Sequence, residues 1–75
     1  MSASQMKVAT AHLLMSLHRK QMADAVARKD QLSFDYAAFR HRELMREHAP
    51  GSYALWARQN PIMAAQDDQA IRARK

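Results

Sequence analysis

The sequence predicts a small all-α protein, and three observations carry this prediction. The 75 residues include one glycine and two prolines, the residues that interrupt helices most strongly. Alanine, methionine, glutamine and arginine are abundant, whereas β-branched residues, which favour strands, are few. Apolar residues recur at the three- and four-residue spacing of amphipathic helices. We therefore expect one domain over 1–75, a bundle of three to four helices with a long N-terminal helix.

The first helix is expected over 4–29, with Ser2 or Ser4 as its N-cap. One of its faces collects Val8, Ala11, Leu14, Met15, His18, Met22, Ala25 and Val26. A second apolar group lies well round the helix and consists of Met6, Leu13 and Leu17. A helix that is apolar on more than one side is usually buried between several neighbours, and a short chain offers few. We therefore predict that this half of the chain packs in a homodimer, with the second group as its self-association residues, or against a partner.

The central helix is expected over 33–48, beginning at Ser33 as N-cap and ending before Ala49-Pro50-Gly51. Its apolar face carries Phe34, Ala37, Ala38, His41, Leu44, Met45 and His48. Phe39 projects on the other face, among arginines. It is interpreted either as a buried contact with another helix or subunit, or as a partner-binding aromatic flanked by Arg42 and Arg46.

Two shorter helices complete the chain. Pro50-Gly51 predicts a tight linker, after which Ser52 caps a helix over 53–59. Within it, Trp56 is interpreted as core that closes the open end of the helical hairpin, or as an exposed binding anchor.

The last helix is expected over 61–72, because Asn60 is a good N-cap and Pro61 suits the first helical position. Asp68 and Arg72 stand four residues apart and should form an ion pair. The few large apolar residues of this helix predict that it is loosely anchored. A basic tail follows over 72–75.

The formal net charge of +5 favours an anionic partner, which means nucleic acid or an acidic protein surface. The first hypothesis is a nucleic-acid-associated regulator or accessory factor whose basic residues contact phosphates. The alternative is a compact inhibitor or adaptor that docks on an acidic surface of a larger protein, with Phe39, Arg42 and Arg46 as its strongest contacts. The full set of candidate binding residues is Arg19, Lys20, Arg28, Lys29, Phe39, Arg40, Arg42 and Arg46.

Catalytic and metal chemistry is poorly represented. The chain has no cysteine and no glycine-rich phosphate loop. His41 and His48 stand seven residues apart, about 10 Å along a helix, whereas helical zinc ligands usually stand four apart. We therefore expect a non-enzymatic protein with no metal, no cofactor and no small-molecule substrate. His18, His41 and His48 are interpreted as half-buried polar residues; a pH-sensitive association or a metal site shared between helices are the alternatives.

No apolar run approaches the roughly 20 residues that span a bilayer. The first residues, MSASQMK, lack the charged start and long apolar region of a secretory signal. We therefore expect a cytoplasmic protein with no membrane partner.

Overall fold

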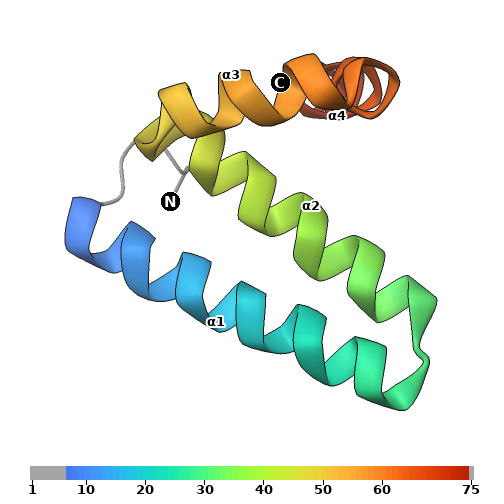
Figure 1. The fold of residues 1–75 in the computed structure, drawn as a ribbon. Coiled ribbons are helices and arrows are strands. Elements are labelled where there is room, and N and C mark those ends of the chain that lie inside the picture. The colour runs from blue at the N-terminus through green and yellow to red at the C-terminus, as the bar shows by residue number, and fades with distance from the viewer. Residues whose placement is uncertain (1–6, 75) are drawn as a thin grey trace.

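The computed structural model describes residues 7–74 as four α-helices in series, coloured along the chain in Figure 1. They are α1 (Val8–Arg28), α2 (Gln31–His48), α3 (Pro50–Gln59) and α4 (Pro61–Ala73). No strand occurs within the described residues, so the all-α prediction is confirmed. A structure of one chain does not test the predicted homodimer.

Helices α1 and α2 form an antiparallel hairpin with a turn of two residues (Figure 1). Helix α1 ends because Lys29 takes a left-handed backbone conformation, with φ of 56°. The N–H groups of Lys29 and Asp30 donate to the carbonyls of Val26 and Ala25, at 3.1 and 2.9 Å, which satisfies the last turn of α1. The chain therefore reverses with little backbone left unpaired.

Asp30 is the N-cap of α2, where the sequence had predicted Ser33. The Asp30 carboxylate accepts hydrogen bonds from the Ser33 N–H at 3.1 Å and from the Ser33 hydroxyl at 2.6 Å. These two bonds, the hydroxyl bond first, lower the pKa of Asp30. Ser33 thus lies inside the first turn and assists the cap, and the predicted start of this helix is corrected by two residues, to Gln31.

Two other predicted helix starts also differ. Helix α1 begins at Val8, because Lys7 is extended with ψ of 146°; the predicted segment 4–6 and the capping serines lie outside the described residues. Helix α3 begins at Pro50, so Pro50-Gly51 is its first turn and Ser52 is not its cap. Proline fits there because the first helical N–H needs no partner.

The apolar core is small and lies between α1 and α2. The buried apolar side chains are Ala11, Met15, Ala25, Ala37, Ala38 and Leu44. Four of the six are alanines, so the two helices meet through short side chains. Helix α3 buries no residue fully, and the buried residue of α4 is an aspartate, Asp67.

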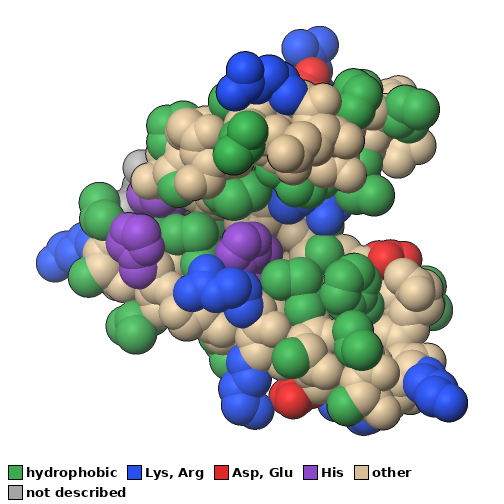
Figure 2. Space-filling model, in the orientation of Figure 1, with side chains coloured by type: hydrophobic (Ala, Val, Ile, Leu, Met, Phe, Trp, Pro, Cys, Tyr) green, Lys and Arg blue, Asp and Glu red, His purple; other side chains and the backbone are tan. Residues whose placement is uncertain are grey.

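Much of the apolar surface of the described chain faces outward. Nine large apolar side chains are between 45% and 83% exposed: Val8, Leu13, Leu17, Val26, Leu32, Tyr36, Leu55, Ile62 and Met63. Figure 2 shows hydrophobic side chains at the surface both of the hairpin and of the α3–α4 part, with basic and histidine side chains between them. None of the helices in residues 7–74 is long and apolar enough to cross a membrane.

Helix α3 folds back over the C-terminal half of α2, and α4 turns away from it at Asn60 (Figure 1). Asn60 occupies the predicted cap position but makes no capping bond; its side-chain amide donates to the Trp56 carbonyl at 3.0 Å. The predicted pair between Asp68 and Arg72 is present at 2.9 Å. Since α4 buries no apolar residue, charged contacts hold it to α2.

Candidate partner-binding site

Two arginines of α2 and two aromatic residues of α3 form one cluster. Arg42 and Arg46 stand one helical turn apart and face the same side. The Arg42 guanidinium lies 4.9 Å from the ring centroid of Trp56, and that of Arg46 lies 6.0 Å from Tyr53. The two rings pack against each other with centroids 5.6 Å apart. We call these four side chains the arginine–aromatic site.

Adjacent aspartates of α4 fill this site. Arg42 donates from Nε and Nη2 to the two carboxylate oxygens of Asp67, at 2.5 and 3.0 Å, which is a two-bond fork. Arg46 Nη2 donates to Asp68 at 2.7 Å. The Arg42 and Asp67 side chains are only 15% and 8% exposed, so solvent screens this pair weakly.

The second arginine is less completely satisfied than the first. Arg46 Nη1 is buried and meets no hydrogen-bond acceptor of the described residues. Asp68, its partner, is shared with Arg72, which approaches the other carboxylate oxygen at 2.9 Å. The aspartates of α4 therefore leave one buried donor of the site unfilled.

Phe39, the aromatic residue singled out from the sequence, is half-buried on α2. The guanidinium of Arg74, at the end of α4, lies 5.7 Å from its ring centroid. Arg74 also pairs with Glu43, which accepts a second ion pair from Arg40 at 3.1 Å. Phe39 and Arg40 thus belong to a further set of contacts between α2 and the end of α4.

Arg19 of α1 meets α2 through a histidine. Its Nη1 donates to His41 Nε2 at 3.2 Å, which requires a neutral imidazole with its proton on Nδ1. Burial, followed by the positive charges of Arg19, His18 and Arg42, lowers the pKa of His41. The predicted half-buried state of His18 and His41 agrees with this arrangement.

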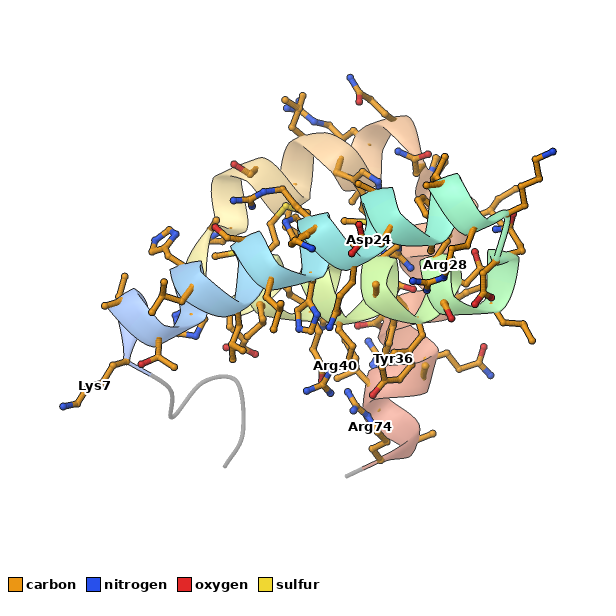
Figure 3. All side chains as sticks on the ribbon, turned by 90° about the horizontal axis from the view of Figure 1, so that it is seen from below. Lys7, Asp24, Arg28, Tyr36, Arg40 and Arg74 are labelled. Carbon is orange, nitrogen blue, oxygen red and sulfur yellow. The ribbon has the colours of Figure 1, made fainter. Side chains whose placement is uncertain are left out.

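The other predicted basic residues are not brought together. Lys20 pairs with Asp24 at 3.2 Å on the exposed surface of α1. Arg28 lies 3.9 Å from Asp30, and Lys29 occupies the hairpin turn. In Figure 3, Arg40 and Arg74 lie close together, where both pair with Glu43, whereas Lys7 and Arg28 lie apart from them and from each other.

The predicted self-association residues that the structure describes are exposed. Leu13 is 72% exposed and Leu17 is 46% exposed, on the side of α1 away from the core. Met6, the third member, lies outside the described residues. Their position leaves two large apolar side chains available to a partner, and association itself stays a prediction.

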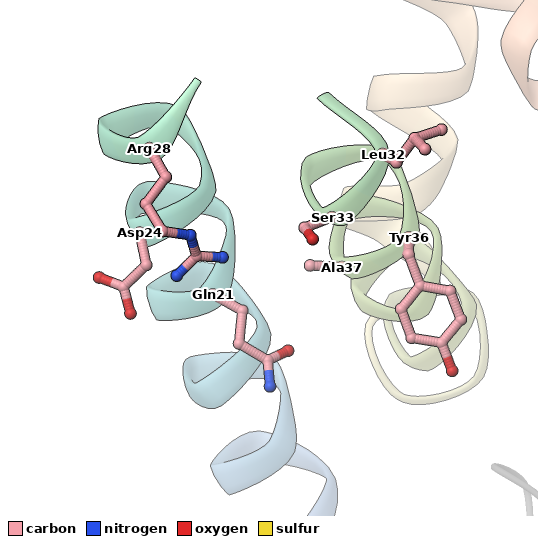
Figure 4. A pocket seen from close by; sticks show the side chains of 7 residues that line it. All are labelled: Gln21, Asp24, Arg28, Leu32, Ser33, Tyr36 and Ala37. Carbon is pink, nitrogen blue, oxygen red and sulfur yellow. The ribbon is translucent and has the colours of Figure 1, made fainter. Parts of the chain in front are cut away.

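A groove of about 440 Å³ lies between α1 and α2 near the hairpin turn. Its lining residues are Gln21, Asp24, Arg28, Leu32, Ser33, Tyr36 and Ala37. Side chains from the two helices stand on its opposite walls in Figure 4. The mixture of charged, polar and apolar groups, with Asp24 and Arg28 each already ion-paired, gives the groove no single ligand chemistry.

Arg42 and Arg46 were predicted from the sequence as binding residues, but the residues that surround them were not. Asp67 was not selected, and Asp68 was predicted only to pair with Arg72. Tyr53 was not selected as a binding residue either. The available signal was two adjacent aspartates in a helix poor in apolar anchors, opposite a helix with two arginines one turn apart.

Comparison of the chain with protein-family models, with curated protein sequences and with solved structures found no match in any of the three.

Proposed function

We propose that this protein is a small, non-enzymatic binding protein whose partners are proteins. The observation that carries the proposal is the balance between hidden and exposed apolar groups. Residues 7–74 bury six apolar side chains, four of them alanine, and leave nine large ones at least 45% exposed. Hydrophobic burial drives most protein association, so a surface of this kind favours docking.

The arrangement of charge favours this proposal over a nucleic-acid-associated regulator. Arg42 and Arg46, central to both hypotheses, are engaged by carboxylates of the same chain. Within residues 7–74, the bases without a carboxylate partner are Lys7, Arg19, Lys29 and Arg58. They lie on α3, at both ends of α1 and near its middle, whereas tracking a duplex needs a continuous basic surface.

Self-association through Leu13 and Leu17 is the simplest form of this function. A second copy that covers both side chains would add the apolar burial that one chain lacks. Fully burying a leucine contributes about 1.5–3 kcal/mol, so two leucines from each copy would contribute substantially to a dimer. The resulting protein would complete its interior by docking, either with itself or with a larger partner.

Light scattering after size-exclusion chromatography tests this proposal. The wild type should gain mass with concentration, and the pair Leu13→Glu and Leu17→Glu should abolish the gain. The matched control is Leu32→Glu with Leu55→Glu, which makes the same two changes on other helices. Leu32 is 83% exposed and Leu55 is 52% exposed. That control should still associate.

The mass of a single chain at every concentration would contradict self-association. A gel shift against random duplex DNA at two salt concentrations provides the test of the other hypothesis. A shift that weakens steeply with salt would return weight to nucleic-acid binding.

A further inference from the structure

We propose that the arginine–aromatic site binds an acidic segment of a partner protein, one that carries two adjacent carboxylates. In the free protein, Asp67 and Asp68 of α4 occupy the site as an intramolecular ligand. This inference rests on the proposed protein-binding function and specifies the chemistry of the partner.

The site is complete without α4. Its four side chains come from α2 and α3, which follow one another along the chain with Ala49 between them. Each guanidinium lies over an aromatic ring, at 4.9 Å for Arg42 and 6.0 Å for Arg46. These cation–π contacts orient two donor forks one helical turn apart, and such forks match carboxylates in shape and charge. Departure of α4 would therefore leave an ordered site for two carboxylates.

Helix α4 is held by charge and can leave as a unit. Its buried residue is Asp67, whereas Ile62 is 77% and Met63 45% exposed, and Ile71 is half-buried. Asn60 separates α4 from α3 without belonging to either helix. Release of α4 therefore breaks ion pairs and needs no helix to unwind.

An incoming acidic segment would restore the ion pairs of Arg42 and Arg46. The pair between Arg74 and Glu43 is the part of the α4 contact that such a segment does not replace.

An external acidic segment can also form a hydrogen bond to Arg46 that α4 does not form. Arg46 Nη1 is buried without an acceptor among residues 7–74, and Asp68 divides its carboxylate between Arg46 and Arg72. A third oxygen on an incoming segment would fill the free donor. Satisfying a buried charged donor is worth more than satisfying an exposed one. An acidic peptide needs only the two arginines of the site, whereas a duplex needs a continuous basic surface, which the bases of residues 7–74 do not form.

The test measures binding of a fluorescent peptide with repeated Asp-Asp pairs by anisotropy. Occupancy of the site by α4 for about nine-tenths of the time weakens the apparent affinity about tenfold. Asp67→Asn with Asp68→Asn should therefore bind about tenfold more tightly than the wild type. Asp24→Asn with Asp35→Asn, on exposed surfaces of α1 and α2, changes the net charge equally and should bind like the wild type.

Adding Arg42→Gln and Arg46→Gln to the Asp67/Asp68 variant should remove the gained affinity. Hydrogen exchange on the wild type keeps the inference testable if a variant folds poorly. Peptide should speed amide exchange across 61–73 and leave α1 unchanged, because α4 is displaced.

Three results would overturn the inference. The two aspartate variants could gain affinity equally, which would indicate general charge attraction. Peptide could bind while α4 keeps its protection, or a short DNA duplex could gain more than the peptide from the Asp67/Asp68 change. The two proposals fail separately. If the wild-type protein stays monomeric but binds the peptide, only self-association through Leu13 and Leu17 is contradicted. If it dimerises but does not bind the peptide, only the present inference is contradicted.

Discussion

Leucine-to-alanine substitutions at positions 44 and 13 remove the same atoms from opposite environments. Leu44 is 4% exposed in the α1–α2 core, whereas Leu13 is 72% exposed on α1. Truncating a buried leucine costs about 2–5 kcal/mol, and a core in which four of six buried apolar side chains are alanines has little with which to refill the space. We expect Leu44→Ala to lower the free energy of unfolding by about 3 kcal/mol, and Leu13→Ala to change it by less than about 0.5 kcal/mol.

Such a loss is large for this chain. At about 0.05–0.15 kcal/mol per residue, a protein of 75 residues has a total stability of about 4–11 kcal/mol. Urea unfolding followed by helical circular dichroism measures the difference. With an m-value of about 1 kcal/mol per molar urea, Leu44→Ala should lower the midpoint by about 3 M. The measurement is made at high dilution, where association contributes nothing.

Concentrated samples then separate folding from docking. If Leu13 lies in an association face, the wild-type midpoint rises with protein concentration, and Leu13→Ala reduces that rise. A Leu13→Ala midpoint as low as that of Leu44→Ala at high dilution would refute the reasoning. It would mean that one chain hides Leu13, and that the exposed apolar surface does not exist in solution.

Three further predictions concern charged and capping residues. Arg42→Met should cost about 1.4 kcal/mol, the tenfold preference that holds α4 on the site, because the unpaired Asp67 then lets α4 leave. Lys20→Met should cost less than about 0.5 kcal/mol in urea unfolding, because its pair is exposed. The cost of Arg42→Met cannot exceed the free energy that holds α4, and a reduced m-value would reveal α4 leaving first. The lowered pKa of His41 means that the unfolded chain binds a proton first, so the melting temperature should be constant above about pH 6.5 and fall below it. His41→Gln should flatten this dependence and His12→Gln, at an exposed position, should keep it; the reverse result would contradict the assignment. Asp30→Ala should lower the melting temperature and Asp30→Asn should largely keep it, because asparagine caps as well as aspartate.

The helices were predictable from the sequence because their signals are local. The end of α2 at His48 follows from Ala49-Pro50, and the start of α4 follows from Asn60-Pro61, as predicted. The start of α2 was missed because Asp30 and Ser33 can both cap. Lys29, which precedes Asp30, takes a left-handed conformation that directs the Asp30 carboxylate toward Ser33 of α2. The identity of Lys29 alone does not reveal that conformation.

The site was only half predictable, because its contacts are distant in sequence. Arg42 and Arg46 were selected as exposed cations on the polar face of a helix. Their aspartate partners lie 25 and 22 residues further along the chain. Helical periodicity describes one helix at a time, so it cannot tell a face turned to solvent from one covered by another polar helix. The exposure of these arginines was thus overestimated.

The use of charge to hold α4 has a consequence for how the molecule works. A buried ion pair such as that of Arg42 and Asp67 gains little net stability, because desolvation offsets most of the attraction, and two apolar side chains of similar size would hold a helix at least as firmly. What charges supply instead is a specific contact that another carboxylate can replace one for one. An apolar anchor would release α4 only by exposing more hydrophobic surface on a chain that already exposes nine large apolar side chains within its described residues. Exchange of one acidic segment for another avoids that cost, and so the arginines of α2 are better suited to a replaceable ligand than to a permanent core.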